Sequence, residues 1–424
     1  MKNIEKIIER EKNGFVYPLY ESFCISSIPS TILNFFNINT KRPILPMEIY
    51  KNIEIENSSK IVLLLIDGLS YNDWIKNYEK FTFFNLLTKK GAVAPITSVF
   101  PSTTASALTT INTGLTPQEH ALFEWVMYFK EIDMVINTLP FTPIDKKGQD
   151  KLLEIGVSPK ILYKGNTIYQ TLKKNGIKSF SFINESYAYS AYSKLMHKGS
   201  TIIPFINSSD LVVRLRKFIE EEDGYFHVYF DVIDAIEHKY GPKTEELRAE
   251  LSVLSFLLKN ELLKKIDRKV ASETLFLIVS DHGQINISPK ETIYLNKYKK
   301  LIKSFQSDKK NRPIPPIGSP RDVFLHIKQN CLEEIHAFVS EKLKEIAKVV
   351  KTRDAIKVGM FGIGKPVKIF YERVGDLLIL PYKNHTVWYQ HVKGKKTELL
   401  GHHGGLSNDE ILVPFAISKL SSLI

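Results

Sequence analysis

Three short apolar runs, each ending in an acidic residue, constrain the fold of this chain more than any other feature. They read KIVLLLI at 60–66, YFHVYFDVID at 225–234 and TLFLIVSDHG at 274–283. Continuous apolar runs of this length are typical of strands that are buried on both faces of a parallel sheet. Residues 244–266 have a helical periodicity with many charges, which suits a crossover helix between such strands. The pattern predicts an α/β fold.

The acidic residues at the ends of these runs are Asp67, Asp234 and Asp281. One aspartate at a strand end is ordinary, because aspartate initiates turns and caps helices. Three are harder to explain in that way. Ligands bind at the carboxyl ends of the strands in open parallel sheets, so we expect these three side chains to meet at one edge.

Histidines accompany two of the three aspartates. His238 follows Asp234 by four residues, on the same face of a helical turn, and His282 directly follows Asp281. A GHHGG segment at 401–405 adds two histidines between glycines that allow close backbone approach. Each histidine alone fits a surface or capping position. Together, these carboxylates and imidazoles are the mixed ligands that zinc and manganese accept.

A hydroxyl-rich run, VFPSTTASALTTINTG, occupies residues 99–114. Taken alone, such a run is typical of a solvated loop. The alternative is a helix start, in which Ser102 and Thr103 could serve as caps and residues 106–113 form a small-residue face packed on the sheet.

Composition limits the class of protein. With 424 residues, 43% of them apolar, the chain can bury one large core or two ordinary ones. Cys24 and Cys331 belong to no paired spacing, which argues against a disulfide framework or a thiolate zinc site and favours a reducing compartment. The charged first residues and the lack of any apolar run near 18 residues predict a soluble, cytoplasmic protein with no membrane partner.

The net charge of +12 would attract anionic partners such as phosphate esters, nucleotides or nucleic acid. The basic residues are scattered, however, and form no nucleic-acid-binding motif. A solvated, lysine-rich surface explains the charge equally well. The sequence gives no indication of oligomeric state.

The motifs together resemble the alkaline phosphatase superfamily and, within it, the type I phosphodiesterase and nucleotide pyrophosphatase group. The resemblance rests on six segments in the family's order: LLLIDG, FPSTTASALTTINTG, GLTPQEHAL, DVIDAIEHKYGP, VSDHG and GHHGG. It implies an alkaline-phosphatase-like three-layer α/β/α sandwich with a mostly parallel central sheet. Residues 1–424 would form a single catalytic domain, with core segments at about 55–300 and 400–424 and an inserted lid subdomain at about 305–400.

The resemblance also implies a site for two divalent metal ions, zinc first and manganese as the alternative. One ion would be held by Asp67, Asp281, His282 and the nucleophile's oxygen, and the other by Asp234, His238 and His403. His403 is chosen over His402 because the family pattern is Gly-any-His-Gly. No other cofactor is implied.

Members of the group place their nucleophilic threonine three residues after the proline of the FPS segment, which is Thr104 here. Coordination to a cation lowers the pKa of such a hydroxyl, and a helix N-terminus adds positive potential. Thr103 and Ser102 remain alternatives, because a helix start cannot be fixed from sequence to within a residue or two.

Two positions depart from the family pattern. Ala105 stands where relatives carry a bulky aromatic after the nucleophile, and Trp125 stands where they carry a phosphate-contacting asparagine. These departures bear on nucleotide specificity more than on hydrolysis. Tyr187, Tyr189 or Tyr192 could supply the missing aromatic wall.

The resemblance implies a metal-dependent hydrolase of phosphodiester or nucleotide pyrophosphate bonds that forms a covalent phosphothreonine, acting on a small phosphodiester or nucleotide. One alternative is a phosphomonoesterase or phosphonate hydrolase of the same superfamily. Another is a non-catalytic protein that binds metal or nucleic acid. Arg321 and Arg373 of the inserted segment are candidate anion contacts, with structural ion pairs as the alternative.

Overall fold

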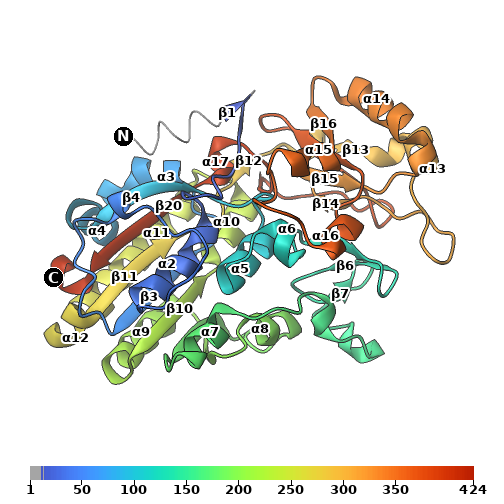
Figure 1. Cartoon of the computed structure of the whole chain (residues 1–424). Coiled ribbons are helices and arrows are strands. Elements are labelled where there is room, and N and C mark those ends of the chain that lie inside the picture. The colour runs from blue at the N-terminus through green and yellow to red at the C-terminus, as the bar shows by residue number, and fades with distance from the viewer. Residues whose placement is uncertain (1–10, 13) are drawn as a thin grey trace.

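Two seven-stranded sheets organise the structure, a computed structural model that describes residues 11–12 and 14–424 (Figure 1). The first sheet lies at the left of Figure 1 and has the order β4-β20-β11-β3-β10-β8-β9. Its strands are β4 (Ala92–Thr97), β20 (Leu412–Lys419), β11 (Thr274–Val279), β3 (Lys60–Ile66), β10 (Gly224–Phe230), β8 (Ser179–Asn184) and β9 (Thr201–Phe205).

The first sheet is mostly parallel, as the sequence predicts. The strands from β11 to β9 pair in parallel, whereas β20 runs antiparallel to both of its neighbours. The register pairs Ile66 with Phe230 and Leu65 with Val279, so β3, β10 and β11 end almost level with one another. The residues that follow these strands therefore emerge at one edge of the sheet.

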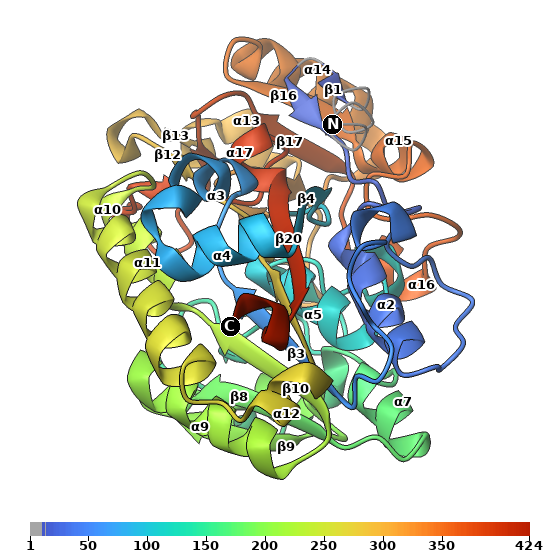
Figure 2. The same ribbon diagram turned by 90° about the vertical axis from the view of Figure 1, so that its left-hand side faces the viewer.

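Both faces of the sheet are covered, because the side chains of a strand alternate between its faces. In β3, Ile61, Leu63 and Leu65 belong to one core, while Val62, Leu64 and Ile66 belong to the other. Figure 2 shows the helices α4 (Thr82–Lys90), α9 (Ser208–Glu221) and α11 (Glu245–Leu257) on one side, and α2 (Ile28–Phe35), α5 (Thr104–Thr113) and α7 (Ile168–Lys174) on the other. The predicted three-layer arrangement is confirmed.

The helix predicted at 244–266 is α11, which continues as a π-helical segment over Leu258–Leu263. It begins after Thr244, whose side chain accepts a hydrogen bond from the backbone N–H of Leu247. Leu247, Leu251 and Leu254 form its buried stripe. None of the helices formed by the described residues is long and apolar enough to cross a membrane.

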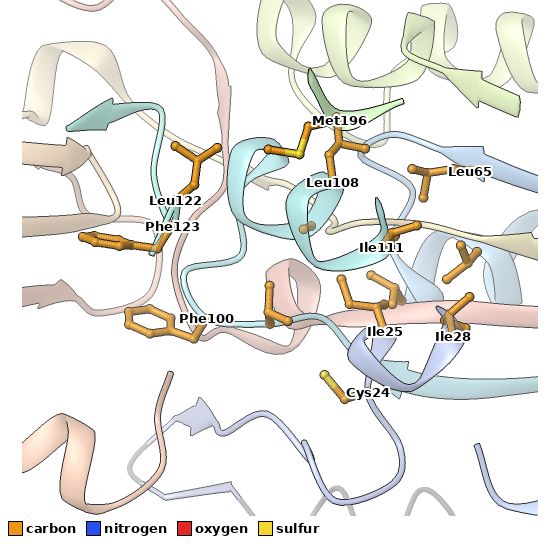
Figure 3. Close-up of a cluster of buried hydrophobic side chains, with 14 of the residues drawn as sticks. Cys24, Ile25, Ile28, Leu65, Phe100, Leu108, Ile111, Leu122, Phe123 and Met196 are labelled. Atoms are coloured by element: carbon orange, nitrogen blue, oxygen red, sulfur yellow. The ribbon is translucent and has the colours of Figure 1, made fainter. Parts of the chain in front are cut away.

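The helix α5 lies against the sheet through its apolar face. Figure 3 shows Leu108 and Ile111 of this helix among Ile25, Ile28 and Leu65. This packing fixes the helix axis and therefore the position of its first residue, Thr104. The helix expected over residues 106–113 is therefore observed, but the side chains that Figure 3 shows in the core are the larger Leu108 and Ile111.

The second sheet is antiparallel and has the order β16-β17-β15-β14-β5-β6-β7. The predicted insertion at 305–400 supplies four strands, and residues 126–143 supply the other three through the pairing of Val126 with Gly318. The strands are β5 (Val126–Phe129), β6 (Met134–Asn137), β7 (Thr142–Pro143), β14 (Ile317–Ser319), β15 (Asp322–Leu325), β16 (Ala347–Lys351) and β17 (Leu377–Pro381). The subdomain boundaries and the lid role stay predictions.

Shorter strands and helices complete the fold. The small strand pairs are β1 (Glu11–Lys12) with β2 (Phe15–Val16), β12 (Ile285–Asn286) with β19 (Gly401–His402), and β13 (Ile293–Tyr294) with β18 (Val387–Trp388). The remaining α-helices are α3 (Tyr71–Asn77), α6 (Pro117–His120), α8 (Ala191–Met196), α10 (Val232–Tyr240), α12 (Arg268–Glu273), α13 (Lys299–Lys303), α14 (Leu332–Leu343), α15 (Thr352–Lys357), α16 (Lys368–Arg373) and α17 (Asn408–Ile411).

Two histidines are buried beside Tyr169 of α7. The rings of His227 on β10 and His197 after α8 lie 5.4 Å apart, and neither nitrogen of His227 has a hydrogen-bond partner in the part of the chain that the structure describes. Burial lowers the pKa of His227 from 6.5 to about 3. Burial and the neighbouring His227 also hold the pKa of His197 well below its ordinary value.

These histidines should make the fold sensitive to acid. An unfolded chain takes up a proton on each histidine near pH 6.5, whereas the folded His227 resists it down to about pH 3, so stability falls as the pH drops below about 6.5. Between pH 7 and pH 5.5, we expect His227→Phe to lose about 1 kcal/mol less unfolding free energy than the wild type. Urea unfolding at both pH values measures this. Each protein is compared with itself at the two pH values, so any pH-independent effect of the substitution on packing cancels. An identical pH dependence in both proteins would show that His227 is not a source of the acid sensitivity.

Candidate metal centre

The side chains predicted for the site converge at the carboxyl edge of the first sheet. Three strand ends supply the acidic residues, since β3, β10 and β11 end level with one another. The helix α10 and the segment after β11 also supply histidines, the start of α5 supplies a threonine, and the segment after β19 supplies a third histidine. The residues that meet there are Asp67, Thr104, Asp234, His238, Asp281, His282 and His403.

Two groups of these side chains have ligand atoms close enough to hold a metal ion. Asp234, His238 and His403 form one group, and Asp67, Asp234 and His282 form the other, with all ligand atoms of a group within 4.8 Å of one another. Asp281 adjoins the second group, because its Oδ2 lies 3.3 Å from Nε2 of His282. Asp234 belongs to both groups, whereas the sequence assigns it to one ion only.

The histidine rings are oriented as metal ligands would be. In each ring Nδ1 faces a backbone carbonyl: that of Gly283 for His282 at 3.3 Å, of Ser102 for His403 at 3.0 Å, and of Gly401 for His238 at 2.9 Å. A proton on Nδ1 donates to that carbonyl and leaves a lone pair on Nε2, which faces the cluster. Burial keeps the pKa values of His282 and His403 well below the ordinary range, so both rings stay neutral.

The carboxylates of Asp67 and Asp281 each have one oxygen that is free to bind a cation. Oδ1 of Asp67 and Oδ2 of Asp281 are buried and have no hydrogen-bond partner among the described residues. The other oxygen is held in both cases: Tyr229 donates to Oδ2 of Asp67, and the backbone N–H groups of Gly68 and His282 donate to Oδ1 of Asp281 at 3.2 and 2.9 Å.

Burial and the neighbouring carboxylates raise the pKa of Asp67 well above its usual value, and burial raises that of Asp281 to about 7. Buried carboxylates are costly unless a cation or a proton compensates them. Their orphaned oxygens, together with lone pairs on imidazole nitrogen, fit a divalent cation of the zinc or manganese type.

Thr104 is the first residue of α5 and points at this cluster. Its Oγ1 lies 3.1 Å from Nε2 of His282. The two alternatives point elsewhere: Ser102 donates to the carbonyl of Gly405 at 2.7 Å, and Thr103 lies 3.4 Å from the carbonyl of Phe123. Among the three hydroxyls, Thr104 is the one that geometry places beside the ligand groups.

The turn after His403 needs its glycines. Gly404 has a φ of +118°, and a Cβ there would lie 2.6 Å from both Oδ1 of Asp322 and Oγ of Ser319. A Cβ at Gly401 would lie 2.3 Å from the carbonyl oxygen of Glu237. The backbone approach inferred from GHHGG is therefore present, and it brings His403 rather than His402 into a ligand group.

The two arginines of the inserted segment are engaged in structural contacts. Arg321 is fully buried and donates to both carboxylate oxygens of Glu410, at 2.9 and 2.8 Å. Glu410 also accepts from the backbone N–H of Gly405 at 3.0 Å, which holds the turn after His403. Arg373 donates to the carbonyl oxygens of Ala121 and Ile161 and to Glu131. Both arginines therefore fit the alternative given for them, structural ion pairs, and not the role of anion contacts.

The aromatic candidates differ in exposure. Trp125 is 41% exposed and Tyr189 is 57% exposed, whereas Tyr192 is buried with its hydroxyl 3.2 Å from Oγ1 of Thr109. Tyr187 donates to Asp231, which precedes α10.

Sequence reasoning missed two residues that contact the metal-ligand candidates. Gln284 donates to Oδ1 of Asp234 at 2.5 Å, and Tyr229 donates to Asp67. Tyr229 lies within an apolar strand and its sequence context indicates only core packing. Gln284 directly follows the Asp-His-Gly motif, which is the signal that could have drawn attention to it.

Comparison with known proteins agrees with the family resemblance seen in the sequence. The profile of the family described as "Type I phosphodiesterase / nucleotide pyrophosphatase" matches residues 61–406. Human "Ectonucleotide pyrophosphatase/phosphodiesterase family member 1" is 26% identical over 215 residues, which are 49% of this chain and 21% of that protein. The matched region thus spans about a fifth of the length of that relative.

Solved structures share the fold. Murine ectonucleotide pyrophosphatase / phosphodiesterase 5 superposes with a TM-score of 0.61 at 16% identity, covering 85% of this chain and 88% of that one. An inactive variant of the murine protein was solved in complex with AMP, with a TM-score of 0.61, 16% identity and coverage of 85% and 87%. The human counterpart gives 0.60 at 17% identity, again with coverage of 85% and 87%. With the family profile matched over most of its length, the chain belongs to the type I phosphodiesterase/nucleotide pyrophosphatase family.

Proposed function

We propose that this protein hydrolyses phosphodiester or nucleotide pyrophosphate bonds with the help of two divalent metal ions and with Thr104 as the nucleophile. The observation that carries the proposal is the position of the Thr104 hydroxyl, 3.1 Å from Nε2 of His282 within one of the two ligand groups. The hydroxyls of Ser102 and Thr103, by contrast, face backbone carbonyl oxygens. Membership of the family supports the same reaction.

Divalent cations bound by these residues would neutralise phosphate oxygens and lower the pKa of the threonine hydroxyl. Zinc is proposed first and manganese second, from the mixture of carboxylate and imidazole donors. Asp67, Asp281, His282 and Thr104 would hold one ion, and Asp234, His238 and His403 the other. Asp234 lies in both groups, so its carboxylate would be available to either ion.

The helix α5 contributes to charge stabilisation. The first N–H groups of an α-helix have no partner within the helix and carry partial positive charge. They lie beside Thr104, the first residue of α5, where phosphate oxygens would arrive. The helix is anchored by buried side chains, so this donor set is fixed before substrate binds.

The reaction proceeds in two displacements. Thr104 Oγ1 attacks phosphorus and loses its proton to solvent, while the bond to the opposite ester oxygen breaks and that oxygen takes a proton from solvent, which gives a phosphothreonine ester. Water then attacks the same phosphorus and loses a proton to solvent, and the bond to Oγ1 breaks, after which Oγ1 takes up a proton to restore the threonine. The start of α5 holds Thr104 in place for both displacements.

The surroundings of Thr104 favour a diester over a monoester. A monoester has an additional negative oxygen that calls for a further cation. Arg321 and Arg373 are satisfied by Glu410, Glu131 and backbone carbonyls. The substrate proposed first is a nucleotide phosphodiester or pyrophosphate, because the murine relative was solved with AMP, the mononucleotide that cleavage of such a bond can release.

Buried acidic groups add to this preference. The carboxyl of Glu124 lies beside Asp322 and the side chain of Thr103, and burial raises its pKa to about 7. Burial and Glu124 raise the pKa of Asp322 well above its usual value. Asp322 therefore holds its proton at neutral pH, and the partly ionised Glu124, next to the residue that precedes Thr104, would repel a dianion more than a monoanion.

Thr104→Ala should lower kcat for a chromogenic phosphodiester by at least ~100-fold, about 2.7 kcal/mol of transition-state stabilisation, because the neighbouring hydroxyls of Ser102 and Thr103 point away from the ligand groups. Thr103→Ala and Ser102→Ala are matched controls, and we expect far smaller losses from them. Metal content should stay near that of the wild type in all three. Equal losses at the three positions would indicate a disturbed helix start instead of a missing nucleophile.

Removing metal should abolish activity. EDTA treatment followed by dialysis should give an inactive protein, and zinc or manganese should restore turnover. Because Asp234 belongs to both ligand groups, Asp234→Asn should lower the bound metal per chain more than His238→Ala, which should remove about one ion of two. Elemental analysis of the purified variants measures this. Full activity of the metal-free protein would rule out the two-metal proposal.

Parallel kinetics on two esters should decide the substrate class. With the same leaving group and metal, kcat/KM for an aryl or nucleotide phosphodiester should exceed that for the matching monoester by at least ~100-fold, about 2.7 kcal/mol. A preference for the monoester would reassign the protein to phosphomonoesterase chemistry. Turnover of a phosphonate monoester in preference to both would favour a phosphonate hydrolase, and salt-sensitive nucleic-acid binding without any turnover would favour a binding protein.

A further inference from the structure

Two tyrosines in ring contact bond to a metal-ligand candidate and to the residue before the helix that carries another. Tyr229 on β10 is 8% exposed and donates its hydroxyl proton to Oδ2 of Asp67. Tyr187, between β8 and α8, donates to Oδ2 of Asp231 at 2.7 Å. The two rings lie 6.3 Å apart at an angle of 64°, which is an edge-to-face contact.

The hydroxyl of Tyr229 determines which oxygen Asp67 can present. With Oδ2 held by the tyrosine, Oδ1 remains without a partner and lies 3.4 Å from Nε2 of His282. A carboxylate held in this way can offer one oxygen to a cation but cannot turn to offer both. The backbone reinforces the position, because the N–H of Asp67 donates to the carbonyl of Phe230, directly after Tyr229, at 2.9 Å.

The hydroxyl of Tyr187 holds the start of α10. Asp231 is the residue before this helix, and its carbonyl accepts from the N–H of Ala235 at 3.4 Å. Asp234 lies in the first turn of α10. A constraint on Asp231 is therefore transmitted along less than one helical turn to Asp234, which belongs to both ligand groups.

We propose that Tyr229 and Tyr187 are positioning residues that together set the spacing of the two metal-ligand groups. We call the two hydroxyls, their partners Asp67 and Asp231, and the contact between the rings the tyrosine bridge. The inference rests on the proposed metal centre. Hydrogen-bonding partners of metal ligands commonly change metal affinity by about 10- to 100-fold when they are removed.

The chain offers a matched control. Tyr225 lies on β10 four residues before Tyr229, on the same face of the strand, and is fully buried with its ring 6.0 Å from that of Tyr169. Tyr225→Phe removes a buried hydroxyl from the same strand without touching a ligand group. It therefore reports the cost of a lost buried hydroxyl alone.

The test is a titration of metal-free protein with Co²⁺, followed by visible absorption, and with Zn²⁺, followed by calorimetry. Tyr229→Phe should weaken one of the two ions by about 10- to 100-fold and should alter the Co²⁺ absorption bands, because Asp67 is freed to change its coordination. Tyr187→Phe should cause a smaller loss. Tyr225→Phe should bind both ions as the wild type does.

The two losses should also be non-additive, since the rings are in contact. A double variant at Tyr229 and Tyr187 should lose less affinity than the product of the two single losses. Urea unfolding of the metal-free proteins is the last measurement. Relative to Tyr225→Phe, the change in the free energy of metal binding in Tyr229→Phe should exceed the change in its free energy of unfolding.

Unchanged affinities and an unchanged Co²⁺ spectrum in Tyr229→Phe would overturn the tyrosine bridge and leave the metal centre standing. Equal effects in Tyr229→Phe and Tyr225→Phe would show a structural role only and would also overturn it. A wild-type protein that binds neither Co²⁺ nor Zn²⁺ would overturn the proposed metal centre itself, and the bridge with it.

Discussion

The electrostatic cost of gathering three carboxylates at one edge of a sheet is the constraint on which the rest of this structure depends. Asp67 and Asp281 are fully buried, and Asp234 adjoins them. In a low-dielectric environment such groups repel one another and raise each other's pKa, unless a cation compensates them. Each of them has a partner for one oxygen, supplied by Tyr229, by backbone N–H groups or by Gln284. The fold thus holds in place a cluster that is unfavourable by itself, as binding sites for cations commonly require.

The second sheet contributes to the same edge from the opposite side. Arg321, between β14 and β15, and Glu410 form a fully buried ion pair, and Glu410 also holds the backbone of Gly405. Breaking a buried pair of this kind by removing one partner commonly costs about 3–5 kcal/mol, because the other charge is left uncompensated. Ser102 donates to the carbonyl of the same Gly405. The turn that carries His403 is therefore fixed jointly by the second sheet and by the segment that leads to Thr104.

The sequence predicted the three central strands of the first sheet because they are buried on both faces. The run at 60–66 coincides with β3, the run at 225–234 covers all of β10 except its first residue, and the run at 274–283 contains β11. The second sheet was not predicted. The strands at 126–143 are short and pair with β14 almost 200 residues away, and such pairings leave no local pattern in a sequence. The insertion at 305–400 was inferred only from the distance between two motifs.

The candidate site was also predicted in part. Motif spacing indicated which aspartates and histidines meet, because strand ends in a parallel sheet share an edge. Spacing carries no distances across the site, so it could not reveal that Asp234 belongs to both ligand groups. Tyr229 could not be distinguished from an ordinary core residue, and the charge of Arg321 gave no indication that Glu410 would satisfy it.

The central claim is that Thr104, placed beside His282 at the start of α5, becomes covalently bound to phosphorus during turnover. Rapid acid quenching of the metal-loaded wild-type protein during turnover of a phosphodiester, followed by peptide mass spectrometry, tests it most directly. If Thr104 is the nucleophile, a phosphoryl-ester adduct on Thr104 appears within one turnover and disappears when substrate is exhausted. An adduct on Ser102 or Thr103, or turnover with no adduct on the segment at 99–114, would contradict it.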